Sequence, residues 1–70
     1  MTVHVISALH ADRGPVVLGV CRSQPEWAEV ESLVAQHIIA GLGEIPTDEV
    51  YATELGKFEE IEVTPMTLQP

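Results

Sequence analysis

A chain of 70 residues with a formal net charge of −8 restricts both the size of the fold and the class of partner. At this length, folding buries only about 60% of the surface that the unfolded chain exposes, so we expect one thin domain. The charge argues against direct contact with nucleic acids or anionic membranes, because proteins neutralise phosphates with Lys and Arg. It favours a partner protein with a basic surface.

The composition is that of a folded domain, since hydrophobic residues make up 46% of the chain and most of them are aliphatic. The single cysteine, Cys21, excludes an internal disulfide. No basic start followed by an apolar run, and no apolar stretch of about 20 residues, is present. We therefore expect a cytoplasmic protein with Cys21 reduced, located in the host cytoplasm if a phage encodes it.

Acidic residues concentrate in the second part of the chain. From Glu26 to Glu62 there are ten acids against Lys57 alone, whereas residues 1–25 are nearly neutral. Two interpretations stay open: the acids form a docking surface for a basic partner, or they keep a small protein soluble.

The first third of the chain predicts a β-hairpin. Thr2 to His10 is rich in β-branched residues, which favour a strand. Residues 11–14, ADRG, are expected to form a four-residue loop with Gly14 in a left-handed conformation. Residues 15–21, PVVLGVC, form the second strand, and Pro15 at its start favours an edge position.

The expected register, which opposes Leu9 to Val16 and Val5 to Val20, gives the hairpin two apolar faces. We expect the main helix to cover the more apolar face, whose members are Val3, Val5, Leu9, Val16, Leu18 and Val20. We expect the other face to stay uncovered, with Ile6, Ala8, Val17, Gly19 and Cys21 at its centre and His4 and His10 toward its ends. An uncovered apolar face predicts a partner molecule.

Ser23 to Glu26 fits a capping box with Pro25 in the first turn, and it predicts the start of a helix. Gly41 and Gly43 offer two possible ends for this helix. At 100° per residue its apolar face comprises Trp27, Val30, Leu33, Val34, His37, Ile38 and Ala40. Trp27 is expected to be a core anchor.

Residues 47–56 admit two interpretations. Thr47 as a cap and acids in the first turn favour a short helix, whereas Val50 and Tyr51 favour a strand, and we prefer the helix. Residues 58–64 alternate polar and apolar side chains and predict the final strand. We therefore expect a single α+β domain over residues 1–64 and a C-terminal tail over residues 65–70.

The order of elements is ββαβ. A right-handed crossover places the third strand parallel to the second and beside the first, which predicts a three-stranded antiparallel sheet in the order 2-1-3. One main helix packs on one face of this sheet, and a short second helix accompanies it.

The histidines do not predict a metal or cofactor site. His4 and His10 are about 20 Å apart along one strand, and His37 belongs to the helix, so His4 and Cys21 would be two ligands without a third. We expect His37 to be structural and Cys21 to be an apolar filler, and we expect no catalytic residue. A ligand-sized pocket beside His10 or His37 would instead favour an enzyme.

Several features together resemble the small uncharacterised ββαβ proteins of actinobacteria and their phages. These features are the valine-rich first strand, the hairpin, Val17-Leu18-Gly19-Val20 followed by Ser23 and a helix, and the closing Glu60-Ile61-Glu62-Val63. The chain departs from that group at Cys21, where an aromatic residue is expected, and in the longer connection over residues 41–57. The resemblance implies an accessory role in phage or mobile elements and carries over no functional residue.

The sequence as a whole predicts a small acidic protein-binding module, of the phage-type inhibitor or anti-defence kind, that docks on a basic surface of a host protein complex. The alternative is a structural or regulatory homodimer without inhibitory activity, and self-association is compatible with both. The expected partner-binding residues are Ile6, Val17, Cys21, Glu59, Glu60 and Glu62. The three glutamates also fit a second role, which is to protect an edge strand from unwanted pairing.

Overall fold

A computed structural model describes residues 1–68 as one three-stranded sheet and two helices. The elements are β1 (Thr2–His10), β2 (Gly14–Cys21), α1 (Trp27–Leu42), α2 (Asp48–Leu55) and β3 (Phe58–Thr67). The sheet has the order β2-β1-β3, and β1 pairs antiparallel with both neighbours. The predicted α+β class, sheet order, main helix and short second helix are all confirmed.

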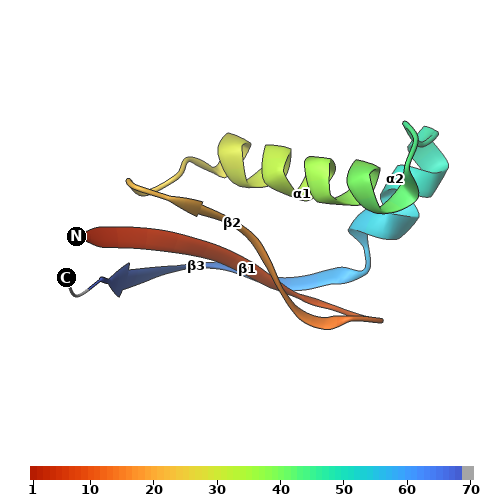
Figure 1. Ribbon diagram of the computed structural model, residues 1–70. Helices are drawn as coiled ribbons and strands as arrows, with labels where there is room; N and C mark the ends of the chain where they lie inside the picture. Colours follow the sequence, from red (N-terminus) through yellow and green to blue (C-terminus); the bar gives the residue numbers. More distant parts are fainter. Residues whose placement is uncertain (69–70) are drawn as a thin grey trace.

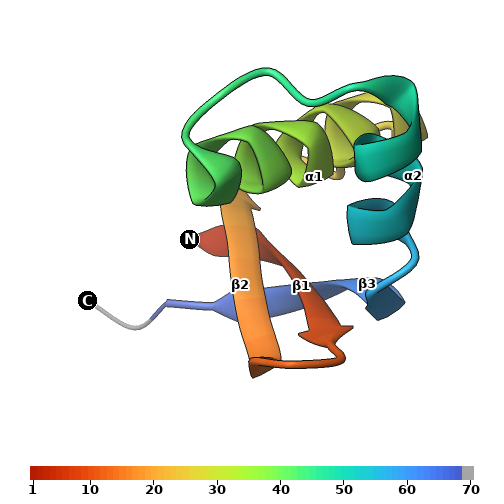
Figure 2. The same ribbon diagram turned by 90° about the vertical axis from the view of Figure 1, so that its right-hand side faces the viewer.

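Both helices lie on the same side of the sheet (Figure 1). α1 runs along the sheet, and α2 stands beside it above the start of β3 (Figure 2). The core between the two layers joins Ala8 of β1, Val34 and Ile38 of α1, and Phe58 of β3. One face of the sheet is therefore covered by the helices, and the other carries no element of residues 1–68 (Figure 1).

The hairpin turn is one residue tighter than predicted. β1 and β2 are joined by residues 11–13, and Gly14 has a φ of 75°, which a glycine adopts without steric cost after a tight turn. Leu9 consequently pairs with Pro15, and not with Val16 as predicted.

A bulge in β2 restores the predicted register in the part of the hairpin farther from the turn. Leu18 has no partner in β1, so the pairing shifts by one residue at this point. Beyond the bulge, Val5 pairs with Val20 and His4 pairs with Cys21, as predicted.

The face packed against α1 agrees only in part with the one predicted. Val16 and Leu18 pack against the core as predicted, whereas Leu9 and Val20 do not. Ile6 is 0% exposed and Ala8 is buried beneath the helix, whereas Val20, which was expected there, is 59% exposed. Small residues between the sheet and α1 explain which face the helix covers. A Cβ atom at Gly19 would lie only 3.0 Å from Cδ1 of Leu33. The face with alanine and glycine lets α1 approach the sheet closely, and a face of larger side chains would hold it farther away.

The start of α1 also differs from the prediction. Its N-cap is Glu26 and not Ser23, and the Glu26 side chain makes no capping hydrogen bond. A helix capped by Ser23 would need helical geometry at Gln24, which Pro25 disfavours at the preceding residue. The chain is non-helical up to Glu26, and the helix begins at Trp27.

α1 ends at the second of the two predicted glycines. Gly43 has a φ of 77°, and its backbone N–H donates to the Ile39 carbonyl at 2.9 Å. The fully buried side chains of the helix are spaced four residues apart: Val30, Val34 and Ile38. Trp27 is 62% exposed, so the prediction that it anchors the core is wrong.

α2 forms the short helix that the sequence favoured. The hydroxyl oxygen of Thr47 accepts from the backbone N–H of Val50 at 3.3 Å, which is the expected N-cap. None of its side chains is fully buried, but Tyr51 is half-buried against the core. α2 is therefore held mainly by its contact with α1 and by the ring of Tyr51.

β3 is longer than predicted. It continues through Pro65 to Thr67, whereas the sequence predicted a strand that stops before Pro65 and a tail over residues 65–70. Proline is tolerated here because β3 is an edge strand, and the side of its backbone that pairs with no strand needs no donor. Residues 69–70 of the predicted tail lie outside the described residues.

Candidate functional site

The uncovered side of the sheet, which we call the open face, combines apolar and acidic side chains. Alternation along the strands directs Leu9, Val17 and Val20 to this side, and their exposed fractions are 37%, 63% and 59%. The half-buried Val5 lies beside Val20 in the same layer. Apolar side chains on the two neighbouring strands thus share this side of the sheet, and we call them the apolar strip.

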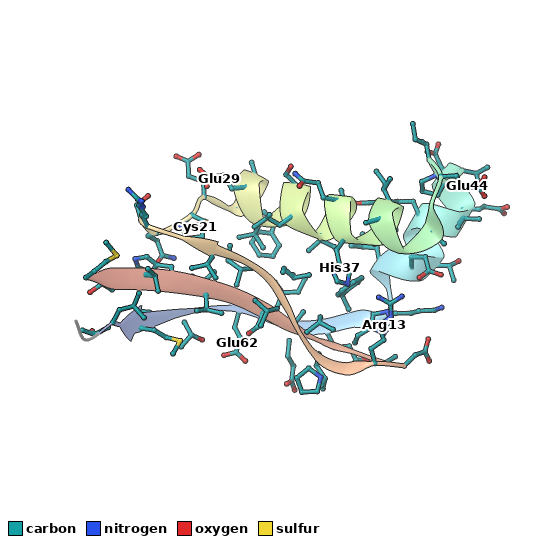
Figure 3. All side chains as sticks on the ribbon, viewed as in Figure 1. Arg13, Cys21, Glu29, His37, Glu44 and Glu62 are labelled. Atoms are coloured by element: carbon teal, nitrogen blue, oxygen red, sulfur yellow. The ribbon has the colours of Figure 1, made fainter. Side chains whose placement is uncertain are left out.

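An acidic row, Glu59, Glu60 and Glu62, runs along β3 at the border of this strip. Cross-strand pairing sets Ser7 between Val17 and Glu62, so one line across the sheet passes from apolar to acidic. Glu62 points away from α1 (Figure 3). All three glutamates are exposed, and within residues 1–68 none of them forms an ion pair.

A bulge in β3 shapes the acidic row. Ser7 pairs with Glu62 and Leu9 with Glu59, so β3 places two residues opposite one residue of β1. Glu60 has a φ of 49°, in the left-handed region that residues other than glycine enter at a cost. The bulge leaves a shallow hollow of about 200 Å³ on the open face, lined by Ser7, Ala8, Leu9, Pro15, Glu60 and Glu62.

Four of the six predicted partner-binding residues meet on the open face: Val17, Glu59, Glu60 and Glu62. The other two do not. Ile6 is 0% exposed beneath α1 and cannot contact a partner. Cys21 is half-buried on the helix side, where it lines a groove with residues of α1. The prediction that these two residues belong to the uncovered face is wrong, because α1 covers the side of the sheet to which Ile6 and Cys21 point.

Sequence reasoning missed Leu9, Val5 and Val20 as open-face residues. It placed them under the helix because they are the larger aliphatic side chains. The signal that could have identified the covered face is the position of the small residues. Ala8 and Gly19 lie where a helix can approach the sheet closely.

A second region of interest is a polar hollow of about 230 Å³ between the hairpin turn and the C-terminal half of α1. Its lining residues are His10, Asp12, Arg13, His37, Ile38, Gly41, Leu42, Glu54, Lys57 and Phe58. A hollow beside both histidines is the feature that would favour an enzyme. The hydrogen bonds of its polar groups decide what it can do.

The His10 side chain is hydrogen-bonded to the hairpin turn. Its Nδ1 accepts from the backbone N–H groups of Asp12 and Arg13 at 3.1 and 3.2 Å, and the ring meets Phe58 edge-on at 4.9 Å. The Nδ1 atom is therefore an acceptor, and the imidazole ring shapes the loop.

The polar side chains of the hollow contact one another. Arg13 Nη1 lies 3.5 Å from Nε2 of His37, and Figure 3 shows the two side chains pointing toward each other. Lys57 Nζ lies 3.2 Å from Glu54 and 3.5 Å from Asp12, and the hydrogen bond and charge of Glu54 raise the pKa of Lys57 above its usual value. Among the lining residues none is Ser, Thr, Cys or Tyr, so the hollow holds no hydroxyl or thiol nucleophile.

Within residues 1–68 no group of three or more His, Cys, Asp and Glu side chains gathers at metal-binding distance. His4 and Cys21 are cross-strand neighbours, and Nδ1 of His4 is buried without a hydrogen-bond partner in the described part of the chain. Two ligands do not make a structural zinc site. Neither α1 nor α2 has the length and apolarity that a membrane-crossing helix needs.

The features that remain as a candidate site are the apolar strip and the acidic row of the open face. Comparisons with known proteins add no assigned residue to it: no family model, no curated protein and no solved structure matches the chain. The likeness to the ββαβ proteins of actinobacteria and their phages stays a prediction that rests on the sequence.

Proposed function

We propose that this chain is a small acidic protein-binding module that docks its open face on a basic surface of another protein. The observation that carries the proposal is the position of unpaired acids directly beside exposed apolar side chains. In protein interfaces, apolar contacts exclude water at the centre while charges at the border guide association and fix orientation. The open face has both parts in this arrangement.

The resemblance to actinobacterial and phage proteins supports a more specific role for this module, as an inhibitor or anti-defence protein. A phage-type inhibitor or anti-defence protein occupies a functional surface of a host complex, and a basic surface attracts a chain with a net charge of −8. The proposed activity is therefore occlusion of a surface, with no chemical step.

One observation favours the alternative, a structural or regulatory homodimer. β2 is an edge strand, and from Gly14 to Cys21 it contains no charged residue, whereas the acids of β3 protect the other edge. Two β2 edges related by a two-fold axis could pair and continue the sheet.

The proposal is tested by recovery of partners from a lysate of an actinobacterial host on immobilised protein. The test variant carries Glu59→Lys, Glu60→Lys and Glu62→Lys. The matched control reverses three exposed acids away from the open face, Glu29, Glu44 and Glu49, so both variants have the same net charge. A third variant, Val17→Glu, alters the apolar strip alone.

We expect one defined partner to be retained by the wild-type chain and by the control, and to be lost from the acidic-row variant and from Val17→Glu. A partner retained equally by all four proteins would contradict docking through the open face. Recovery only of the chain itself, disrupted by Val17→Glu, would replace the proposal with the homodimer.

A further inference from the structure

A third hollow, on the helix side of the sheet, is separate from the open face. It has a volume of about 290 Å³ and lies between the first half of α1, α2 and β3. We call it the aromatic groove, and its lining residues are Trp27, Val30, Glu31, Val34, Tyr51, Leu55 and Ile61. Figure 2 shows the two helices side by side above β3, which is the arrangement that forms its walls.

The lining combines aliphatic, aromatic and acidic side chains. Aliphatic side chains from three elements form most of the wall, and Trp27 and Tyr51 contribute aromatic rings from two different helices. Glu31 is the only charged lining residue, and it carries a negative charge. The Trp27 side chain is 62% exposed, although burial of an aromatic ring is normally favourable.

These groups define the ligand class. Aromatic faces attract cations through the ring quadrupole, a carboxylate adds a direct charge, and an apolar wall favours a ligand with a hydrocarbon body. Anions are disfavoured, because Glu31 is the one charged lining residue within residues 1–68 and its charge is negative. A groove of this volume holds a compact ligand of roughly ten non-hydrogen atoms.

We propose that the aromatic groove binds a small organic cation with an apolar body, such as an aryl- or alkylammonium ion. The binding event is non-covalent, and it is independent of the protein docking proposed for the open face, since the two sites lie on opposite sides of the sheet.

The test compares phenyltrimethylammonium with tert-butylbenzene, which has the same shape and no charge. Trp27 is the only tryptophan of the chain, so its fluorescence reports directly on the groove. We expect the cation to change this fluorescence saturably and to shift the methyl NMR signals of Val30, Val34, Leu55 and Ile61. We expect the neutral isostere to bind at least about fivefold more weakly, because it loses both the cation–π and the carboxylate attraction.

Two variants locate the charge effect. Glu31→Gln keeps the shape of the groove and should weaken phenyltrimethylammonium binding about threefold to fivefold without changing tert-butylbenzene binding. Glu29→Gln removes a charge from the same exposed helix outside the groove and should leave both ligands unaffected. A third variant, Tyr51→Leu, tests the aromatic wall. It should weaken phenyltrimethylammonium binding about threefold, because one aromatic face is lost.

Equal binding of the charged and neutral ligands, with no effect of Glu31→Gln, would overturn the cation assignment and leave a merely apolar groove. Equal weakening by Glu29→Gln and Glu31→Gln would also overturn it, because the effect would then come from net charge. Absence of saturable binding of phenyltrimethylammonium at millimolar concentration, and of tert-butylbenzene up to its solubility limit, would remove the site altogether. None of these results bears on the open-face variants, so failure of one proposal is distinguishable from failure of the other.

Discussion

His10 holds the hairpin turn in place from inside the core. It is the one buried polar residue among the described residues, and its Nδ1 satisfies two backbone N–H groups that the turn leaves without strand partners. A buried polar group persists in a core when it is hydrogen-bonded, and the edge contact with Phe58 supplies the packing. The histidine that invited a catalytic interpretation thus acts as part of the turn.

This role predicts different costs for two substitutions. His10→Phe keeps an aromatic ring and removes the acceptor, so we expect the free energy of unfolding to fall by about 1–2 kcal/mol. His10→Ala also removes the ring and should cost about 3 kcal/mol. Urea unfolding followed by circular dichroism measures both values. His37→Phe is the control. It keeps a ring beside Phe58, and it removes a hydrogen bond to Arg13 that is 3.5 Å long and should contribute less than about 1 kcal/mol. Wild-type stability of His10→Phe would contradict the role of the two hydrogen bonds.

Each edge strand of the sheet contains a bulge, and the two bulges have different consequences. In β2 the unpaired Leu18 turns toward the core and packs against it. In β3 the bulge places Glu60 in a left-handed conformation and turns its carboxylate into the exposed acidic row. Local backbone strain is therefore retained at the position where the chain presents its charge.

The strain at Glu60 predicts that glycine is favourable there. Glu60→Gly removes the steric cost of a positive φ, which should exceed the entropy that glycine loses on folding, and we expect an increase of about 0.5–1 kcal/mol in the free energy of unfolding. Glu59→Gly is the matched control at a neighbouring position of the same strand with ordinary backbone geometry, and it should lower that free energy by a similar amount. Chemical denaturation of the two variants gives the comparison, and a loss of stability in both would show that the bulge is not strained.

At the scale of the whole molecule, hydrophobic patterning and turn residues predicted the strands, the two helices and the order of the sheet. They did not predict which face α1 covers, because both faces of PVVLGVC are apolar and the count of large side chains favoured the wrong one. The deciding contact, Gly19 against Leu33, joins residues of two elements and has no periodic signal in the sequence. The acidic row was visible as a run of glutamates, but its position beside the apolar strip depends on the pairing of β3 with β1.

The net charge of the molecule predicts opposite salt dependences for the two functional alternatives. Two copies of a chain with a net charge of −8 repel each other, so association of the chain with itself should strengthen as salt screens that repulsion. Docking of the acidic row on a basic partner is an attraction between opposite charges and should weaken under the same change. Sedimentation velocity of the isolated chain at about 20 mM and about 500 mM salt, and partner retention in the same two buffers, measure the two responses. We expect a monomer of 7.6 kDa at low salt and a partner complex that dissociates at high salt. A dimer that is stable at low salt and separates at high salt would mean that specific charge pairs join the copies, which the unpaired glutamates of the open face do not provide.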